Sequence, residues 1–218
     1  MGCVERTFLL VGTLLLAWVF PVWSQTGSNE RSQLVVSVYD DVGISGSVLG
    51  EVERHAGMIF GQGGVDVVWI NCSSHAEVVA AGCERIDPTG HFALRFVHKP
   101  GRSANDVVGA AFLSDQGIGC YGDVFYDRAM ERSQDWDVTL PELLGTVAAH
   151  EIGHLLLGSN SHSNSGIMKA KWQSGELRRI SNGNLGFTGD QAERMRVRLT
   201  ATHGVRPMQL AVSNGPPL

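Results

Sequence analysis

The chain has 218 residues, which is enough for one domain with a hydrophobic core. Hydrophobic residues make up 43% and charged residues 18%, a balance that excludes a disordered chain. The net charge is −5 and the longest basic run is Arg178-Arg179, so we expect no nucleic-acid partner.

The first 24 residues are typical of a secretory signal peptide. Arg6 precedes an apolar stretch over residues 8–20, and the small residue Ser24 follows it. A membrane anchor is disfavoured because this stretch is shorter than the roughly 20 residues that span a bilayer. We predict cleavage near Ser24, a secreted or periplasmic protein, and no membrane association once the signal is removed.

The segment after the signal alternates between predicted strands and one helix. Residues 34–39 predict a strand, residues 47–60 a helix, and residues 65–70 a buried strand rich in β-branched side chains. Three more strands are predicted over residues 92–97, 110–113 and 123–127.

The second half is predicted to be mostly helix and loop. A long helix is expected over residues 141–157, because Pro141 suits a first turn and Gly158 can end the helix. Residues 159–187 are rich in Ser, Asn and Gly and predict a loop. Thr188 is expected to cap a final helix that reaches about residue 199.

This order of elements predicts an α+β protein (α/β-like), with a long helix packed on one face of a mixed, twisted sheet. Cys72 and Cys83 could close a small loop as a disulfide in an oxidising compartment, which would leave Cys120 unpaired. Other pairings stay open. A structural zinc site with four thiolates is excluded because only three cysteines remain after the signal is removed.

The predicted long helix carries the motif His150-Glu151-Ile152-Gly153-His154. Two histidines four residues apart project from one face of a helix and can bind a single Zn²⁺. Glu151 is close enough to act as a general base on water at that metal without being a ligand. The alternative is a helix whose histidines are merely buried and hydrogen-bonded.

The stretch from His150 to His162, followed by Gly166-Ile167-Met168, resembles the metzincin clan of zinc peptidases. The resemblance implies a zincin-type fold, with an N-terminal subdomain over residues 25–160 and a C-terminal subdomain over 161–218 that holds a methionine turn. It also implies His150, His154 and His162 as ligands of one zinc ion, Glu151 as the base, and Met168 as the hydrophobic floor.

The spacing departs from the clan pattern in the third ligand. Each interval is longer by one residue than in the clan pattern, since Gly158 is four residues beyond His154 and His162 is four beyond Gly158; in strict clan register, Asn160 occupies the ligand position. We favour His162, because Asn is a poor zinc ligand beside imidazole. The rivals are the later carboxylates Glu176 and Asp190.

A weaker resemblance links residues 110–127 to the matrixin branch. It implies that Ala110, Ala111, Phe112 and Leu113 form an edge strand on which an extended peptide substrate pairs. Phe125 stands where matrixins have a histidine, so a second zinc ion is not expected from this segment.

We therefore expect a secreted, monomeric zinc endopeptidase that acts on peptides or proteins. The alternative is a secreted zinc-binding domain of zincin fold that captures peptides without cutting them. The retained Glu151 favours the enzyme, because a pure binding module needs no carboxylate beside an open metal position.

Overall fold

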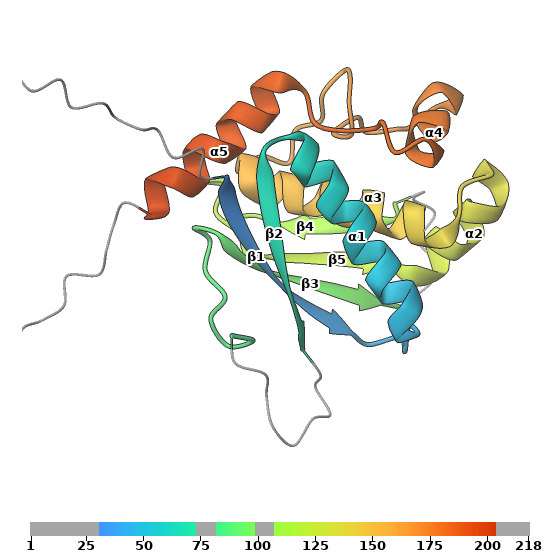
Figure 1. Cartoon of the computed structure of the whole chain (residues 1–218), viewed down its shortest axis with the longest axis horizontal. Helices are drawn as coiled ribbons and strands as arrows, with labels where there is room; N and C mark the ends of the chain where they lie inside the picture. The colour runs from blue at the N-terminus through green and yellow to red at the C-terminus, as the bar shows by residue number, and fades with distance from the viewer. Residues whose placement is uncertain (1–30, 73–81, 99–106, 204–218) are drawn as a thin grey trace, which may run out of the picture. The chain divides into compact units, whose positions relative to one another are not determined.

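The computed structural model describes residues 31–72, 82–98 and 107–203, and the predicted signal peptide lies outside them. The described part contains a five-stranded sheet and five helices, drawn in Figure 1. The strands, in chain order, are β1 (Ser32–Asp40), β2 (Val65–Cys72), β3 (His91–Val97), β4 (Gly109–Phe112) and β5 (Tyr121–Phe125).

The sheet is mixed and twisted, as expected from the sequence (Figure 1). Its strand order is β2-β1-β3-β5-β4. The pairs up to β5 are parallel, and β4 alone runs antiparallel at the edge. The edge strand predicted over residues 110–113 is present, but it begins and ends one residue earlier, so Leu113 lies just beyond it. Within the strand, Ala111 pairs with Gly122.

The helices are α1 (Gly46–Gln62), α2 (Tyr126–Trp136), α3 (Leu140–Leu157), α4 (Ser174–Ser181) and α5 (Gly189–His203). The predicted helices over residues 47–60, 141–157 and 188–199 correspond to α1, α3 and α5. As predicted, Thr188 caps α5, since its hydroxyl accepts a bond from the Gln191 backbone N–H at 3.3 Å. No helix among the described residues is long and apolar enough to cross a membrane.

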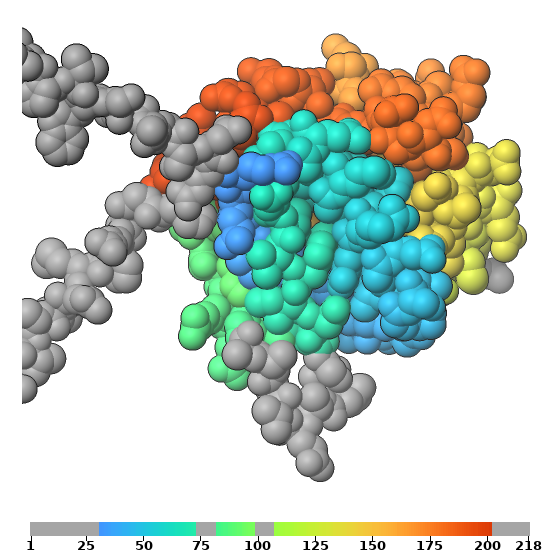
Figure 2. Space-filling model, viewed as in Figure 1, coloured from blue at the N-terminus to red at the C-terminus, as the bar shows by residue number. Residues whose placement is uncertain are grey.

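Helices α1 and α3 pack directly against each other and against the sheet. A Cβ added at Gly145 of α3 would lie 2.8 Å from the Val52 carbonyl oxygen of α1, so the backbones approach too closely for any side chain. At the same contact, the His55 ring nitrogen Nε2 lies 3.2 Å from the Thr146 hydroxyl. The outer surface of α1, in cyan, lies beside β2 in Figure 2.

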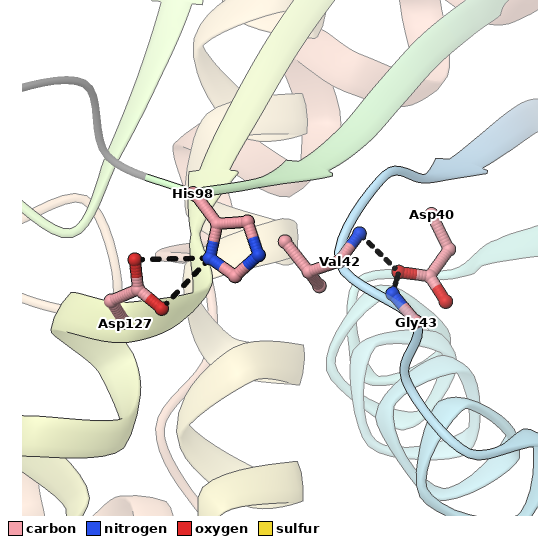
Figure 3. A network of polar contacts seen from close by, with 5 residues as sticks. All are labelled: Asp40, Val42, Gly43, His98 and Asp127. Atoms are coloured by element: carbon pink, nitrogen blue, oxygen red, sulfur yellow. Dashed lines mark hydrogen bonds and ion pairs between the residues drawn. The ribbon is translucent and has the colours of Figure 1, made fainter.

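The strand predicted over residues 123–127 is wrong at its end. Strand β5 stops at Phe125, and Asp127 belongs to the first turn of α2. There its carboxylate contacts the His98 ring nitrogen Nδ1 at 3.0 Å, as Figure 3 shows. An acidic residue in a first helical turn is favourable because it faces the unpaired backbone N–H groups.

A second turn in Figure 3 ends strand β1. The Asp40 carboxylate accepts bonds from the backbone N–H groups of Val42 and Gly43, at 3.1 and 3.0 Å. These bonds hold the connection between β1 and α1.

The prediction of a continuous loop over residues 159–187 is also wrong, because α4 lies within it. The Gln173 backbone N–H donates to the Glu176 carboxylate at 3.0 Å, and Ile180 is fully buried. One buried apolar residue in a short polar segment leaves almost no periodic pattern, so tertiary packing decides this helix.

Cys72 and Cys83 are joined by a disulfide, and Cys120 is a free thiol. The Tyr39 hydroxyl donates to the Cys83 carbonyl at 2.8 Å, which ties the disulfide loop to β1. The described residues after Glu30 fall within one compact unit. The subdomain boundary near residue 160 stays a prediction.

Candidate metal centre

Helix α3 is buried on all sides, which positions its polar side chains rigidly. The Thr139 backbone N–H donates to the Glu142 side chain at 3.1 Å and starts the helix. Gly158 ends it with φ +64°, a left-handed conformation that glycine adopts without steric cost. Such a helix normally carries apolar residues all round, so the buried His150, Glu151 and His154 need a specific explanation.

The two helical histidines are held in one orientation by backbone carbonyl groups. The His150 ring nitrogen Nδ1 lies 2.8 Å from the Ile167 carbonyl, and the His154 Nδ1 lies 2.7 Å from the Ser159 carbonyl. A carbonyl only accepts, so both Nδ1 atoms carry the proton. Both Nε2 atoms are then unprotonated in the neutral rings, and they face each other at 3.0 Å.

This facing pair fits a metal ion. Two lone pairs at 3.0 Å repel each other unless a cation lies between them. Two nitrogen ligands of a tetrahedral zinc ion at its usual bond length would be about 3.3 Å apart. Burial and the neighbouring His154 lower the pKa of His150 to about 3, and burial also lowers the pKa of His154. Both rings are therefore neutral and able to bind metal at physiological pH.

His162 brings a third imidazole to the same point. Its ring centroid lies 5.4 Å from that of His150 and 5.0 Å from that of His154. One ligand nitrogen from each of the three rings can be chosen so that all lie within 4.8 Å of one another. Among the residues that the structure describes, this is the group of three or more such side chains that could hold a metal ion.

The alternative third ligands, Glu176 and Asp190, do not lie in the cluster of imidazoles. The Glu176 carboxylate pairs with the Lys169 ammonium group at 2.8 Å, and Asp190 is in the first turn of α5. Neither joins the cluster of imidazoles. Asn160 lines the same cleft as His162. The geometry therefore favours His162 over the carboxylates.

The segment just after His162 is held by backbone hydrogen bonds. The Ser163 backbone N–H donates to the Met168 carbonyl at 2.8 Å, and the Ile167 N–H donates to the Gly186 carbonyl at 2.9 Å. The Trp172 indole N–H donates to the Ile167 carbonyl at 3.0 Å, the same oxygen that holds His150. One carbonyl oxygen thus links the orientation of the first ligand to the segment after the third.

Met168 is buried beneath the helix that carries the ligands. A Cβ added at Gly153, between His150 and His154, would lie 2.7 Å from the Met168 sulfur atom. The glycine in the motif is therefore needed for close packing of this methionine against α3.

The Glu151 side chain faces the edge strand β4. A Cβ added at Gly109 would lie 2.6 Å from the Glu151 carboxylate oxygen Oε1. The Ala111 backbone N–H donates to the same carboxylate, which lowers its pKa, but burial outweighs this effect and raises the pKa of Glu151 to about 8. The positive charge of a bound metal ion would oppose this rise and favour the carboxylate, the form that can accept a proton.

These groups share one cleft of about 720 Å³. The three histidines and Glu151 form part of its lining, together with residues 107–111 that lead into and form β4. A cleft of this size is in the range of small-ligand and peptide sites. The cleft brings together a candidate metal site, a protonatable carboxylate and an exposed sheet edge.

Several cleft residues were not singled out from the sequence, among them Arg132 and Trp136 on α2 and Trp172 beyond Met168. The sequence carried a weak signal for α2, because its charged pairs Arg128–Glu131 and Arg132–Asp135 are spaced i, i+3. No local signal points Trp172 toward Ile167, which is a tertiary contact.

No family model matches the chain, and no curated protein matches it in sequence. Among solved structures, the chain is similar to an archaemetzincin from Methanopyrus kandleri. The two share 16% identity with a TM-score of 0.48, and the match covers 78% of this chain and 98% of that one.

Proposed function

We propose that the protein is a zinc-dependent endopeptidase. The observation that supports this most strongly is the pair of unprotonated Nε2 atoms of His150 and His154, 3.0 Å apart, with His162 beside them. An arrangement of buried lone pairs is unfavourable in a purely structural histidine cluster and favourable around a cation. The proposal assigns one zinc ion to these three imidazoles.

His150, His154 and His162 would hold a zinc ion with one position left open, and the ion would supply Lewis-acid activation of water and of a substrate carbonyl group. Glu151 is assigned as the general base that takes a proton from the attacking water. It then donates this proton to the leaving amine, so its charge is restored at the end of each cycle. A carboxyl group sheltered from bulk water retains the proton between these two steps.

Strand β4 is assigned as the surface on which the substrate binds. An extended peptide can add to an exposed sheet edge through backbone hydrogen bonds. Ala110 and Ala111 line the cleft beside Glu151, and their small side chains leave room for an extended substrate peptide. We assign Met168 to the clan's methionine turn because it packs against Gly153 directly below the ligand helix.

The proposal places the enzyme outside the cytoplasm. Its support is the signal-peptide pattern of residues 1–24 and the disulfide between Cys72 and Cys83, a bond that persists in oxidising compartments. Expression of the full chain followed by mass spectrometry of the exported protein tests this. A mature N-terminus near residue 25 is expected, and retention of the intact chain inside the cell would contradict it.

The decisive experiment compares zinc-loaded wild type with Glu151→Gln on an unfolded protein substrate. We expect cleavage to fall by about 1,000-fold in the variant, as for removal of a general base, while the zinc content stays unchanged. Glu51→Gln, at an exposed position of α1, is the matched control and should cut like wild type. Zinc-loaded wild type that binds peptides but never cuts them would favour the non-catalytic binding domain.

A further inference from the structure

The cleft is basic although the whole chain is acidic. The net charge of the chain is −5. Three cationic side chains line the cleft, namely Arg132, Lys169 and Lys171. Among the described lining residues, Glu151 is the acidic one. A bound zinc ion would add further positive charge to the same cavity.

The basic residues approach the cleft from two separate elements. Arg132 lies on α2, which follows directly after β5. The Phe125 backbone N–H at the end of β5 donates to the Val108 carbonyl at 2.9 Å, so the start of α2 lies beside the chain that enters β4. Lys169 and Lys171 come from the segment that Trp172 ties to Ile167. A peptide in the cleft would therefore meet positive charge from more than one wall.

The three cations differ in how strongly they are already paired. Lys169 is bonded to Glu176 at 2.8 Å and is largely screened from solvent. Arg132 contacts Asp135 at 3.5 Å on its own helix, and its guanidinium lies 5.7 Å from the centre of the Trp136 ring. Lys171 is exposed and has no ion-pair partner among the described residues. Lys171 is thus the cation most available to a ligand.

Resting on the proposed peptidase activity, we propose that the site selects peptides with acidic side chains near the scissile bond, with Lys171 as the main recognition residue. Positive charges along the walls of a low-dielectric cleft focus the field and attract anionic ligands. A single exposed ion pair contributes little, but several acting together give about a tenfold preference.

Binding is measured first, so that the result does not depend on cleavage. Zinc-loaded Glu151→Gln is titrated with a short peptide carrying Glu at alternate positions and a neutral fluorophore, or with the same peptide carrying Gln. We expect the Glu peptide to bind about tenfold more tightly, and the preference to shrink as salt is raised. Lys171→Glu should abolish the preference and Lys171→Arg should keep it.

Arg178→Glu supplies a matched charge reversal at an exposed position of α4 that does not line the cleft. It should retain the preference, which excludes a general effect of net charge. Equal binding of the Glu and Gln peptides, or an undiminished preference in Lys171→Glu, would overturn the assignment of acidic substrates.

Cleavage of the same two peptides by wild type separates this inference from the proposed function. A preference for the Glu peptide in kcat/KM supports both. Cleavage without preference overturns acidic selection and leaves the peptidase standing. Binding preference without any cleavage supports acidic recognition and contradicts the peptidase.

Discussion

The candidate metal centre is built from two regions that differ in almost every physical respect. His150 and His154 lie on α3, buried, one helical turn apart, with both rings oriented by backbone carbonyls. His162 is exposed and lies in an irregular segment that is held by backbone hydrogen bonds to other loop residues.

This difference shows how the site divides its tasks. The helix supplies a fixed pair of nitrogens, because any movement of these rings would require repacking of the core. The segment after Gly158 supplies the third nitrogen through a few backbone bonds, so its position costs less to change. The helical ligands therefore contribute to folding as well as to metal binding, and His162 contributes to metal binding alone.

The strongest test of this division replaces one ligand from each region. His162→Ala and His154→Ala should each reduce zinc affinity by more than about 100-fold, because loss of a ligand exceeds the effect of its supporting groups. Only His154→Ala should also lower the stability of the metal-free protein. Zinc titration and chemical unfolding in a chelator measure the two effects.

Asn160→Ala is the control for the third ligand. Asn160 lines the cleft, but it is not an imidazole, and its removal should change zinc affinity little. Strong loss of zinc in Asn160→Ala with retention in His162→Ala would mean that the ligand segment follows strict clan register.

The tight packing around Glu151 predicts the next largest effect. Gly109→Ala would place a methyl group 2.6 Å from the Glu151 carboxylate, so the carboxylate or β4 must move. We expect kcat to fall by roughly 30-fold while zinc binding persists, since misplacement of a catalytic group by about 1 Å can cost 100-fold.

Gly122→Ala is the matched control on the neighbouring strand. Its added Cβ would lie at an ordinary 3.5 Å from the Glu151 Cβ, so activity should stay close to that of wild type. Equal loss of activity in both variants would show that the strands, and not the position of the carboxylate, limit catalysis.

A smaller effect is expected where the two regions meet. Trp172→Phe keeps an aromatic ring beside His150 but removes the indole N–H that donates to the Ile167 carbonyl. Zinc affinity should fall by about tenfold, the lower range for loss of an outer hydrogen bond at a metal site. An unchanged affinity, measured by competition with a chelating dye, would show that this bond does not position the site.

The smallest predicted effect concerns pH and the contact between α1 and α3. Burial lowers the pKa of His55, which faces Thr146, with Glu142 and Arg54 as its charged neighbours. Below about pH 6.5, the His55 side chain binds more protons in the unfolded chain than in the folded one. The free energy of unfolding therefore decreases as the pH falls through this range.

Glu151 acts in the opposite direction, because its raised pKa stabilises the folded state as the pH falls below about 8. Comparison with His55→Gln isolates the histidine from this effect. Between pH 7 and pH 5, the metal-free wild type should lose more stability than His55→Gln in urea unfolding. Parallel pH profiles of the two proteins would contradict a neutral, buried His55.

The sequence was most informative where a pattern repeats along one element. Helix α3 was predictable because apolar residues surround the motif and because Pro141 and Gly158 mark its ends. Strands β1, β2 and β3 were predictable from β-branched and apolar runs. The two short helices α2 and α4 were not predicted, because each has only one fully buried residue and so shows no apolar periodicity.

The limits of local pattern also explain the errors at the edges of elements. Asp127 was assigned to a strand because it follows an apolar run, whereas its contact with His98 and its place in a first helical turn decide for α2. The carbonyl of Ile167, which joins His150 to Trp172, has no sequence signature at all, because any residue has a carbonyl group.

The sequence by itself determined two imidazoles and a carboxylate on one turn of a buried helix, because helical geometry converts a spacing of four residues into a shared face. Only the tertiary structure decided which later side chain completes the cluster, which strand faces Glu151, and which charges line the cleft. Those choices depend on contacts between residues far apart in the chain, and no local spacing encodes them.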